Sequence, residues 1–165
     1  MIEGERKKKT KSVDAAYLSL CMTCSKMERC GSDARRSLYR WEVPPGEHQK
    51  IIDKLKAEKF IDEQRYADAY VREKVAAGRW GLNKITFGLK TKQIPDDMIQ
   101  NALEQYADAG RMVKKLEEEL KRRITKEQVK AKDDYDLRIR LFRFAASRGY
   151  GFDQINDILD RILKG

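Results

Sequence analysis

The stretch 61–103, IDEQRYADAYVREKVAAGRWGLNKITFGLKTKQIPDDMIQNAL, decides how we expect the chain to fold. Within 66–75, apolar residues recur on one face at about 100° per residue, which predicts an amphipathic helix over 62–78. A second helix is predicted over 82–92, and a third after Pro95, a residue that suits the first turn of a helix. Helices joined by links this short must pack together, so the stretch predicts a three-helix unit.

The sequence on both sides follows the same plan. Residues 13–60 predict three helices, with Ser32 as the N-cap of the second and His48 near the start of the third. Residues 108–165 predict a long helix, a second one that ends at Arg148-Gly149, and a final one. When Val43, Ile94 and Tyr150 are superposed at the turn into the third helix, apolar positions coincide across all three segments.

These matching positions favour an all-α fold, a tandem array of three three-helix repeats that is elongated and curved. The alternative is three independent helical segments that share only generic amphipathic spacing. The predicted domains are a basic, disordered tail at 1–12 and repeats at 13–60, 61–107 and 108–165.

Composition limits the class of protein. The 165 residues are 41% hydrophobic, but the chain lacks the apolar run of about 20 residues that a membrane span needs. The segment MIEGERKKKTKS at 1–12 has no apolar core of the kind that secretory signals carry. Three cysteines fit a reducing compartment better than a disulfide framework, so we expect a cytoplasmic protein.

The chain is strongly basic, with a net charge of +9. Residues 1–12 contribute +3 of this charge, so the predicted folded part remains basic at +6. Such a balance is compatible with nucleic acid or a nucleoprotein surface, but it is equally typical of a solvated surface without a ligand.

The residue types bear on two kinds of chemistry, metal binding and catalysis. Cys21, Cys24 and Cys30, with His48 further on, could suggest a metal site, but the spacing completes neither a zinc-ribbon nor a ferredoxin pattern. Buried packing of the cysteines is the stronger interpretation, so no metal or cofactor is expected. His48 is the only histidine, expected at a partly buried edge, and nucleotide-binding, hydrolase and metalloprotease motifs are missing, so we do not expect an enzyme.

The central stretch also carries a family resemblance. The run DEQRYADAYV, the turn GRWG and the run KQIPDDMIQNAL resemble the central repeat of the RecX family, regulators of the RecA recombinase. The resemblance covers about 14–165 and is poorest over 124–134. It implies tandem three-helix repeats and a regulator that binds RecA filaments on DNA and inhibits their recombinase, ATPase and coprotease activities. It supplies no catalytic residues.

Charge and predicted exposure point to a set of partner-binding residues for the RecA filament or DNA. They are Arg65, Arg72, Arg79, Trp80, Lys84 and Lys90. Trp80 is as readily explained by packing against a neighbouring repeat. We expect a monomer, and we expect any contact with single- or double-stranded DNA to be made through phosphates. The remaining alternatives are a direct DNA-binding regulator resembling a helix-turn-helix protein, and a metal-containing redox protein.

Overall fold

The computed structural model describes residues 10–106 and 110–164, and nine α-helices lie within these ranges. We define unit 1 as α1–α3, unit 2 as α4–α6 and unit 3 as α7–α9, because all the extensive helix–helix contacts in the described residues fall within these groups. The helices are α1 Val13–Lys26, α2 Gly31–Arg40, α3 Pro45–Ala57, α4 Glu63–Ala77, α5 Leu82–Thr91, α6 Asp96–Glu104, α7 Gly110–Gln128, α8 Asp134–Ser147 and α9 Phe152–Leu163.

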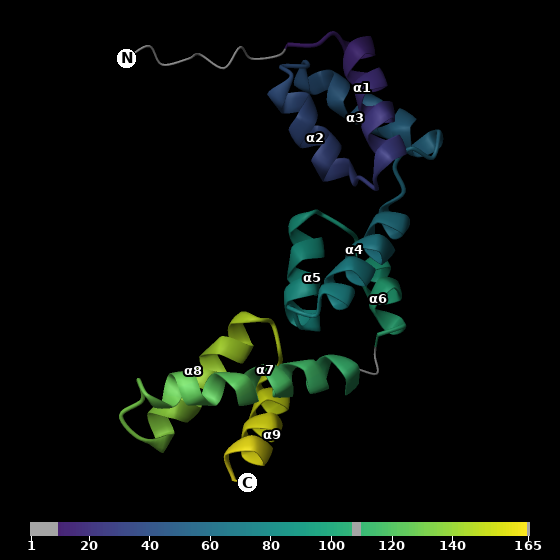
Figure 1. Ribbon diagram of the computed structural model, residues 1–165. Coiled ribbons are helices and arrows are strands. Elements are labelled where there is room, and N and C mark those ends of the chain that lie inside the picture. Colours follow the sequence, from purple (N-terminus) through teal and green to yellow (C-terminus); the bar gives the residue numbers. More distant parts are fainter. Residues whose placement is uncertain (1–9, 107–109, 165) are drawn as a thin grey trace, which may run out of the picture.

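The three units follow one another along a bent axis, with unit 1 at one end of the molecule and unit 3 at the other (Figure 1). The predicted all-α tandem array is thereby confirmed. Residues 1–9 of the predicted tail lie outside the described residues, as do 107–109. Lys11 is held against unit 1: its backbone N–H donates to the Trp41 carbonyl at 3.0 Å, and its ammonium lies 4.0 Å from the Trp41 ring centroid.

Local capping explains the bounds of several helices, with side-chain N-caps at the start of α1, α4 and α8. In unit 2, the Asp62 carboxylate accepts from the Arg65 backbone N–H at 2.9 Å, and Gly78 ends α4 with a φ of 68°. Pro95 precedes α6, as predicted. Ser32 was a wrong choice of N-cap: α2 begins at Gly31, after Cys30.

The internal repeat is visible in a recurring turn before the third helix of each unit. The residue that enters this helix donates its backbone N–H to the carbonyl five residues earlier, and the residue before it has a positive φ. The donor–acceptor pairs are Val43–Leu38 at 3.1 Å, Ile94–Leu89 at 3.2 Å and Tyr150–Ala145 at 3.4 Å. The residues with positive φ are Glu42 at 56°, Gln93 at 59° and Gly149 at 88°. The superposition predicted from the apolar positions therefore extends to the backbone.

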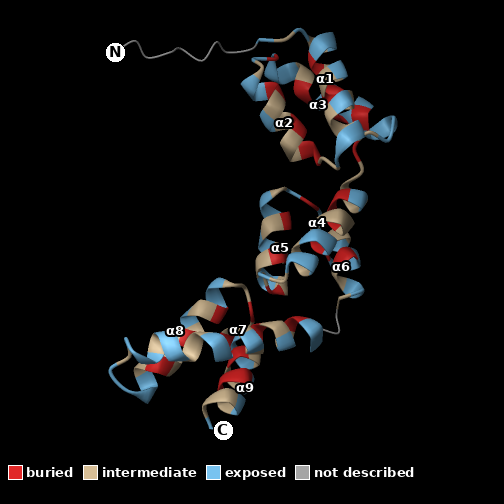
Figure 2. Cartoon of the chain, viewed as in Figure 1, coloured by how far each residue is buried: buried red, intermediate tan, exposed pale blue. Residues whose placement is uncertain are grey.

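Buried residues face the interior of each unit, and exposed ones cover the outside (Figure 2). They form two separate clusters. One lies within unit 1 and includes Leu38, Ile52 and Leu55; the other runs through units 2 and 3 and also takes in Cys30 from unit 1. Unit 1 thus has its own core, whereas units 2 and 3 share one.

His48 is fully buried in unit 1, not at a partly buried edge as expected from the sequence. Its Nε2 lies 2.8 Å from the Val43 carbonyl oxygen, and its ring packs edge-on against Tyr39 with 4.5 Å between centroids. The imidazole therefore joins the turn before α3 to the helix itself.

Candidate functional site

Joint 1–2, the contact between units 1 and 2, is made mainly by charged side chains. Glu63 at the start of α4 accepts from the backbone N–H of Gly31 at 3.0 Å and pairs with Lys56 at 3.2 Å. Two further ion pairs cross the joint, one between Arg65 and Glu28 at 2.7 Å and one between Lys92 and Asp33 at 2.5 Å. A cleft of about 350 Å³ lies here, and its charged lining residues include both signs.

Joint 2–3, the contact between units 2 and 3, includes direct hydrogen bonds between backbone groups. The N–H of Gly81 donates to the Arg148 carbonyl at 2.7 Å, and the N–H of Asn83 donates to the Gly149 carbonyl at 3.2 Å. The start of α5 therefore meets the end of α8. This contact satisfies backbone groups that neither helix can satisfy internally, and it aligns the two helix dipoles favourably.

The close approach at joint 2–3 requires glycine on both sides. A Cβ on Gly81 would lie 2.5 Å from the Gly149 carbonyl oxygen, and a Cβ on Gly149 would lie 2.3 Å from the Lys84 Cβ. Gly149 also has a φ of 88°, a conformation that residues with a side chain rarely adopt. The two backbones could not approach so closely with larger residues.

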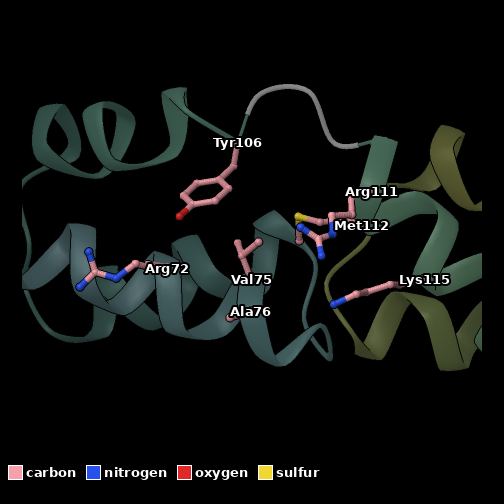
Figure 3. A pocket seen from close by; sticks show the side chains of 7 residues that line it. All are labelled: Arg72, Val75, Ala76, Tyr106, Arg111, Met112 and Lys115. Atoms are coloured by element: carbon pink, nitrogen blue, oxygen red, sulfur yellow. The ribbon is translucent and has the colours of Figure 1, made fainter.

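Beside this backbone contact lies a second cleft, of about 300 Å³, between α4 and the start of α7 (Figure 3). We call it the cationic cleft. Val75, Ala76 and Met112 supply apolar lining, and the Tyr106 ring lies between Arg72 at one end and Arg111 at the other. Lys115 lies at the same end as Arg111.

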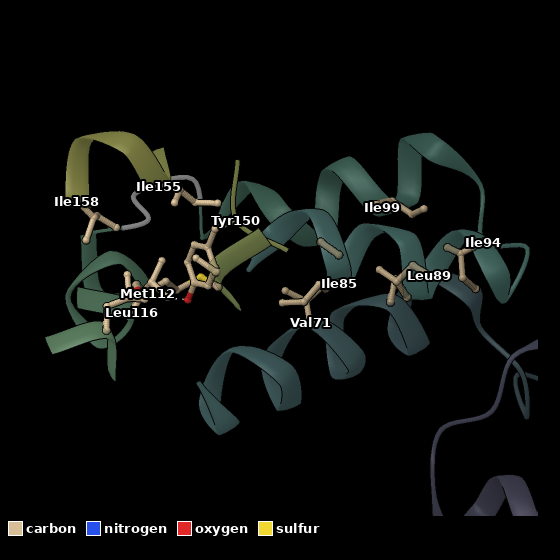
Figure 4. Packing of buried hydrophobic residues seen from close by; sticks show 14 of the residues in the cluster. Val71, Ile85, Leu89, Ile94, Ile99, Met112, Leu116, Tyr150, Ile155 and Ile158 are labelled. Carbon is tan, nitrogen blue, oxygen red and sulfur yellow. Dashed lines mark hydrogen bonds between the residues drawn. The ribbon is translucent and has the colours of Figure 1, made fainter. Parts of the chain in front are cut away.

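Met112 connects this cleft to the shared core of units 2 and 3 (Figure 4). In that core Val71, Ile85 and Leu89 of unit 2 pack in one cluster with residues of unit 3 that include Leu116. The Tyr150 hydroxyl donates to the Met112 carbonyl at 3.3 Å, so the buried phenol is hydrogen-bonded. The cleft is thus built on a packed, continuous interior.

Trp80 lies half-buried at the α4–α5 turn, between two lysines. The Lys74 and Lys84 ammonium groups lie 5.2 and 4.9 Å from its ring centroid, and the Lys84 ammonium donates to the Ser147 carbonyl at 3.1 Å. Cation–π contacts of this kind contribute about 0.5–1 kcal/mol at exposed sites. Lys84 therefore helps to hold unit 2 against unit 3, and Trp80 packs beside it against the shared core.

The structure distributes the six predicted partner-binding residues over different surroundings. Arg79, Trp80 and Lys84 come together at joint 2–3, and Arg72 lies nearby in the cationic cleft. Arg65 belongs to joint 1–2, and Lys90 pairs with Asp96 at 3.2 Å on the outside of unit 2. Within the described residues, only the Arg72 and Arg79 side chains of the five cations have no hydrogen-bonding, ion-pair or aromatic partner.

Arg111 and Lys115 were missed by the sequence reasoning. They lie four residues apart on α7, next to the buried Met112 and Leu116, and both line the cationic cleft. The spacing would have placed them on one face of the helix. The docking of α7 on unit 2 was needed to place that face opposite Arg72.

Cys21 and Cys24 pack against the core of unit 1, whereas Cys30 belongs to the cluster that units 2 and 3 share. Cys30 is buried, and burial raises the pKa of its thiol; burial likewise raises the pKa of the half-buried Cys24. Both shifts favour the protonated, unreactive thiol. Among the described residues, no three or more His, Cys, Asp or Glu side chains are grouped so that they could hold a metal ion.

Fold and site together define a class: an all-α tandem-repeat protein with a basic chain and a cationic cleft between two of its units. Comparisons with known proteins narrow this class. Residues 62–103 match the family model described as RecX, second three-helix domain. Regulatory protein RecX of Clostridium botulinum strain Eklund 17B is 32% identical over 111 residues, which cover 67% of this chain and 50% of that protein. The chain belongs to the RecX family.

Other relatives agree with this assignment. Regulatory protein RecX of Bacillus pumilus is 31% identical over 134 residues, covering 78% of this chain and 48% of that protein. The chain spans about half the length of these curated relatives. The crystal structure of RecX from Lactobacillus salivarius has the same fold, with a TM-score of 0.75 at 20% identity over 93% of this chain and 97% of the other. Every helix in the described part is too short or too polar to span a bilayer.

Proposed function

We propose that this chain binds filaments of the RecA recombinase on DNA and limits their recombinase, ATPase and coprotease activities. The observation that carries the proposal is the family match, which joins residues 62–103 to a regulatory family. The bent array of units adds support, because it offers an extended surface that can contact several subunits of a polymer at once.

We further propose that regulation takes place by binding and not by catalysis, in the cytoplasm, as part of the control of recombination, DNA repair and the SOS response. The only histidine is buried in unit 1 against the Val43 carbonyl, where it cannot reach a substrate. A ligand that binds one state of a filament more tightly than another shifts the equilibrium toward that state. Binding alone is therefore a sufficient mechanism.

The exposed cations of unit 2 are the residues through which we expect this binding. Arg65 and Lys84 hold the joints, so the test changes Arg72, Arg79 and Lys90 together to glutamate and leaves both joints intact. A matched control changes Lys26, Arg36 and Lys50 of unit 1. It reverses the same number of charges, and Lys50, like Lys90, forms one exposed ion pair.

RecA ATPase on single-stranded DNA is then measured against increasing protein. We expect the original chain to inhibit the ATPase, and the unit 2 variant to need about tenfold more protein at low salt, with a smaller difference at high salt. The control should stay within about twofold, since its charges lie away from the proposed contact. Inhibition unchanged in the folded unit 2 variant would reject these contacts. Tight duplex binding without any effect on RecA would favour the direct DNA-binding alternative.

A further inference from the structure

We propose that the cationic cleft of joint 2–3 binds a single strand of nucleic acid, with phosphates at its two charged ends and the apolar middle facing a sugar or base. This deepens the proposed function by giving the chain a nucleic-acid ligand of its own. The strand-binding measurement below contains no recombinase and a separate RecA ATPase assay accompanies it, so either idea can fail without the other.

Charge is the first argument for this ligand. The described residues that line the cleft include Arg72, Arg111 and Lys115 and no carboxylate. In the part of the chain that the structure describes, none of the three side chains has an ion-pair or hydrogen-bond partner. The cleft of joint 1–2 differs, because carboxylates line it beside its cations, and two of them, Asp33 and Glu73, pair with Lys92 and Lys74. Three unpaired cations around one hollow attract a polyanion.

The arrangement of the charges is the second argument. Arg72 lies at one end and Arg111 with Lys115 at the other, while Val75, Ala76 and Met112 line the cleft with the Tyr106 ring nearby (Figure 3). A nucleic-acid strand repeats this order, because a less polar sugar and base lie between successive phosphates. Aromatic rings in basic grooves commonly bind single strands by stacking on bases, and arginine binds phosphate through two parallel hydrogen bonds.

The size of the cationic cleft favours a single strand over a duplex as its ligand. A hollow of about 300 Å³ can admit a phosphate and one nucleotide face, but not a double helix, whose bases are paired and turned inward. The cleft is also held open by fixed structure. The Lys115 side chain crosses Gly78 so closely that a Cβ there would lie 2.6 Å from its Nζ, and Met112 belongs to the shared core.

The variant for the test replaces Arg72, Arg111 and Lys115 by glutamine. The matched control replaces Lys114, Lys126 and Arg143 by glutamine; these are exposed residues of unit 3 outside the cleft, and the control removes the same net charge. Circular dichroism and thermal unfolding confirm that both variants fold. Binding of a fluorescent oligothymidylate to purified protein is then followed by anisotropy over a range of salt concentrations.

We expect the cleft variant to bind the strand at least tenfold more weakly and the control within about threefold of the original chain. The slope of log affinity against log salt should fall by about 2 in the cleft variant, at roughly 0.7 per lost phosphate contact. A duplex of the same length should compete at least tenfold less well than the strand.

Four results would overturn the inference: no binding by the original chain, equal losses in both variants, equal competition by duplex, or equal competition by polyglutamate. The last would assign the cleft to an acidic protein segment. RecA ATPase measured in parallel with the cleft variant separates the two proposals. Lost strand binding with full ATPase inhibition supports the strand site and leaves the proposed regulation intact.

Discussion

Joints 1–2 and 2–3 both involve the start of the second helix of a unit. The backbone N–H groups at that point have different hydrogen-bond acceptors in the two joints. At joint 1–2 the N–H of Gly31 donates to the side chain of Glu63. At joint 2–3 the N–H groups of Gly81 and Asn83 donate to backbone carbonyls at the end of α8. One unit is therefore attached through flexible charged groups, and the other through fixed backbone.

This difference extends to the interior. Unit 1 has a core of its own, and among its described buried residues only Cys30 belongs to the cluster of its neighbour, whereas units 2 and 3 share a continuous core. Surface ion pairs are weakened by salt, but buried apolar contacts and backbone hydrogen bonds are much less so. We infer that units 2 and 3 move as one body and that unit 1 is attached to it adjustably.

The largest expected effect comes from breaking joint 2–3. Gly149→Ala places a methyl group against the backbone of Lys84 at a φ of 88°, and strain and overpacking together should lower the free energy of unfolding by about 3 kcal/mol. Urea denaturation measures this. Gly46→Ala is the control: it lies in α3 with nothing within 4 Å of its Cβ, and it should be neutral or stabilising by up to about 1 kcal/mol. A loss below about 0.5 kcal/mol for Gly149→Ala would show that the close contact is not needed.

High salt should make unit 1 unfold at a different urea concentration from units 2 and 3. The chain has two tryptophans, Trp41 against the core of unit 1 and Trp80 against the shared core, so Trp41→Phe and Trp80→Phe each leave one reporter. We expect the urea midpoints of the two reporters to coincide at low salt. Near 1 M salt, where charges are screened beyond about 3 Å, the midpoints should differ by about 0.5 M urea. Coincident midpoints at both salt concentrations would mean that joint 1–2 does not depend on its ion pairs.

Among those ion pairs, Lys92–Asp33 should contribute most. Its side chains are 24% and 12% exposed, so water screens the pair less than a fully exposed one. A double-mutant cycle with Lys92→Met and Asp33→Asn should give a coupling energy of about 1 kcal/mol that falls with added salt. A coupling energy near zero would assign the strength of the joint to Glu63 and the packing of Cys30 instead.

Local signals made much of the fold predictable. Asp62, Gly78 and Pro95 act on the helices next to them, and they mark the bounds of α4 and α6 in the structure as they do in the sequence. Ser32 misled because α2 starts where a group from another unit, the Glu63 carboxylate, accepts from Gly31. Such a partner is distant in sequence, and helix-capping rules read only neighbouring residues.

The candidate site was less predictable for the same reason. Charge and predicted exposure selected Arg72, Arg65 and Lys84 alike. The structure distinguishes them, because Arg65 and Lys84 are engaged at the joints, whereas Arg72 lines the cationic cleft. Arg111 and Lys115 belong to the cleft only because α7 packs across the end of unit 2. Periodicity assigns a residue to one face of its helix. It does not say what that face meets.

The smallest expected effect tests Arg65, which was predicted to bind a partner and is found paired with Glu28. With side chains 44% and 32% exposed, the pair should show a coupling energy of only about 0.5 kcal/mol in a cycle of Arg65→Gln and Glu28→Gln. The two variants break the same ion pair but change the net charge in opposite directions. If Arg65 acts through the joint, both should change RecA inhibition in the same direction and to a similar extent. If it also touches an anionic partner, Arg65→Gln should weaken inhibition while Glu28→Gln leaves it unchanged or strengthens it.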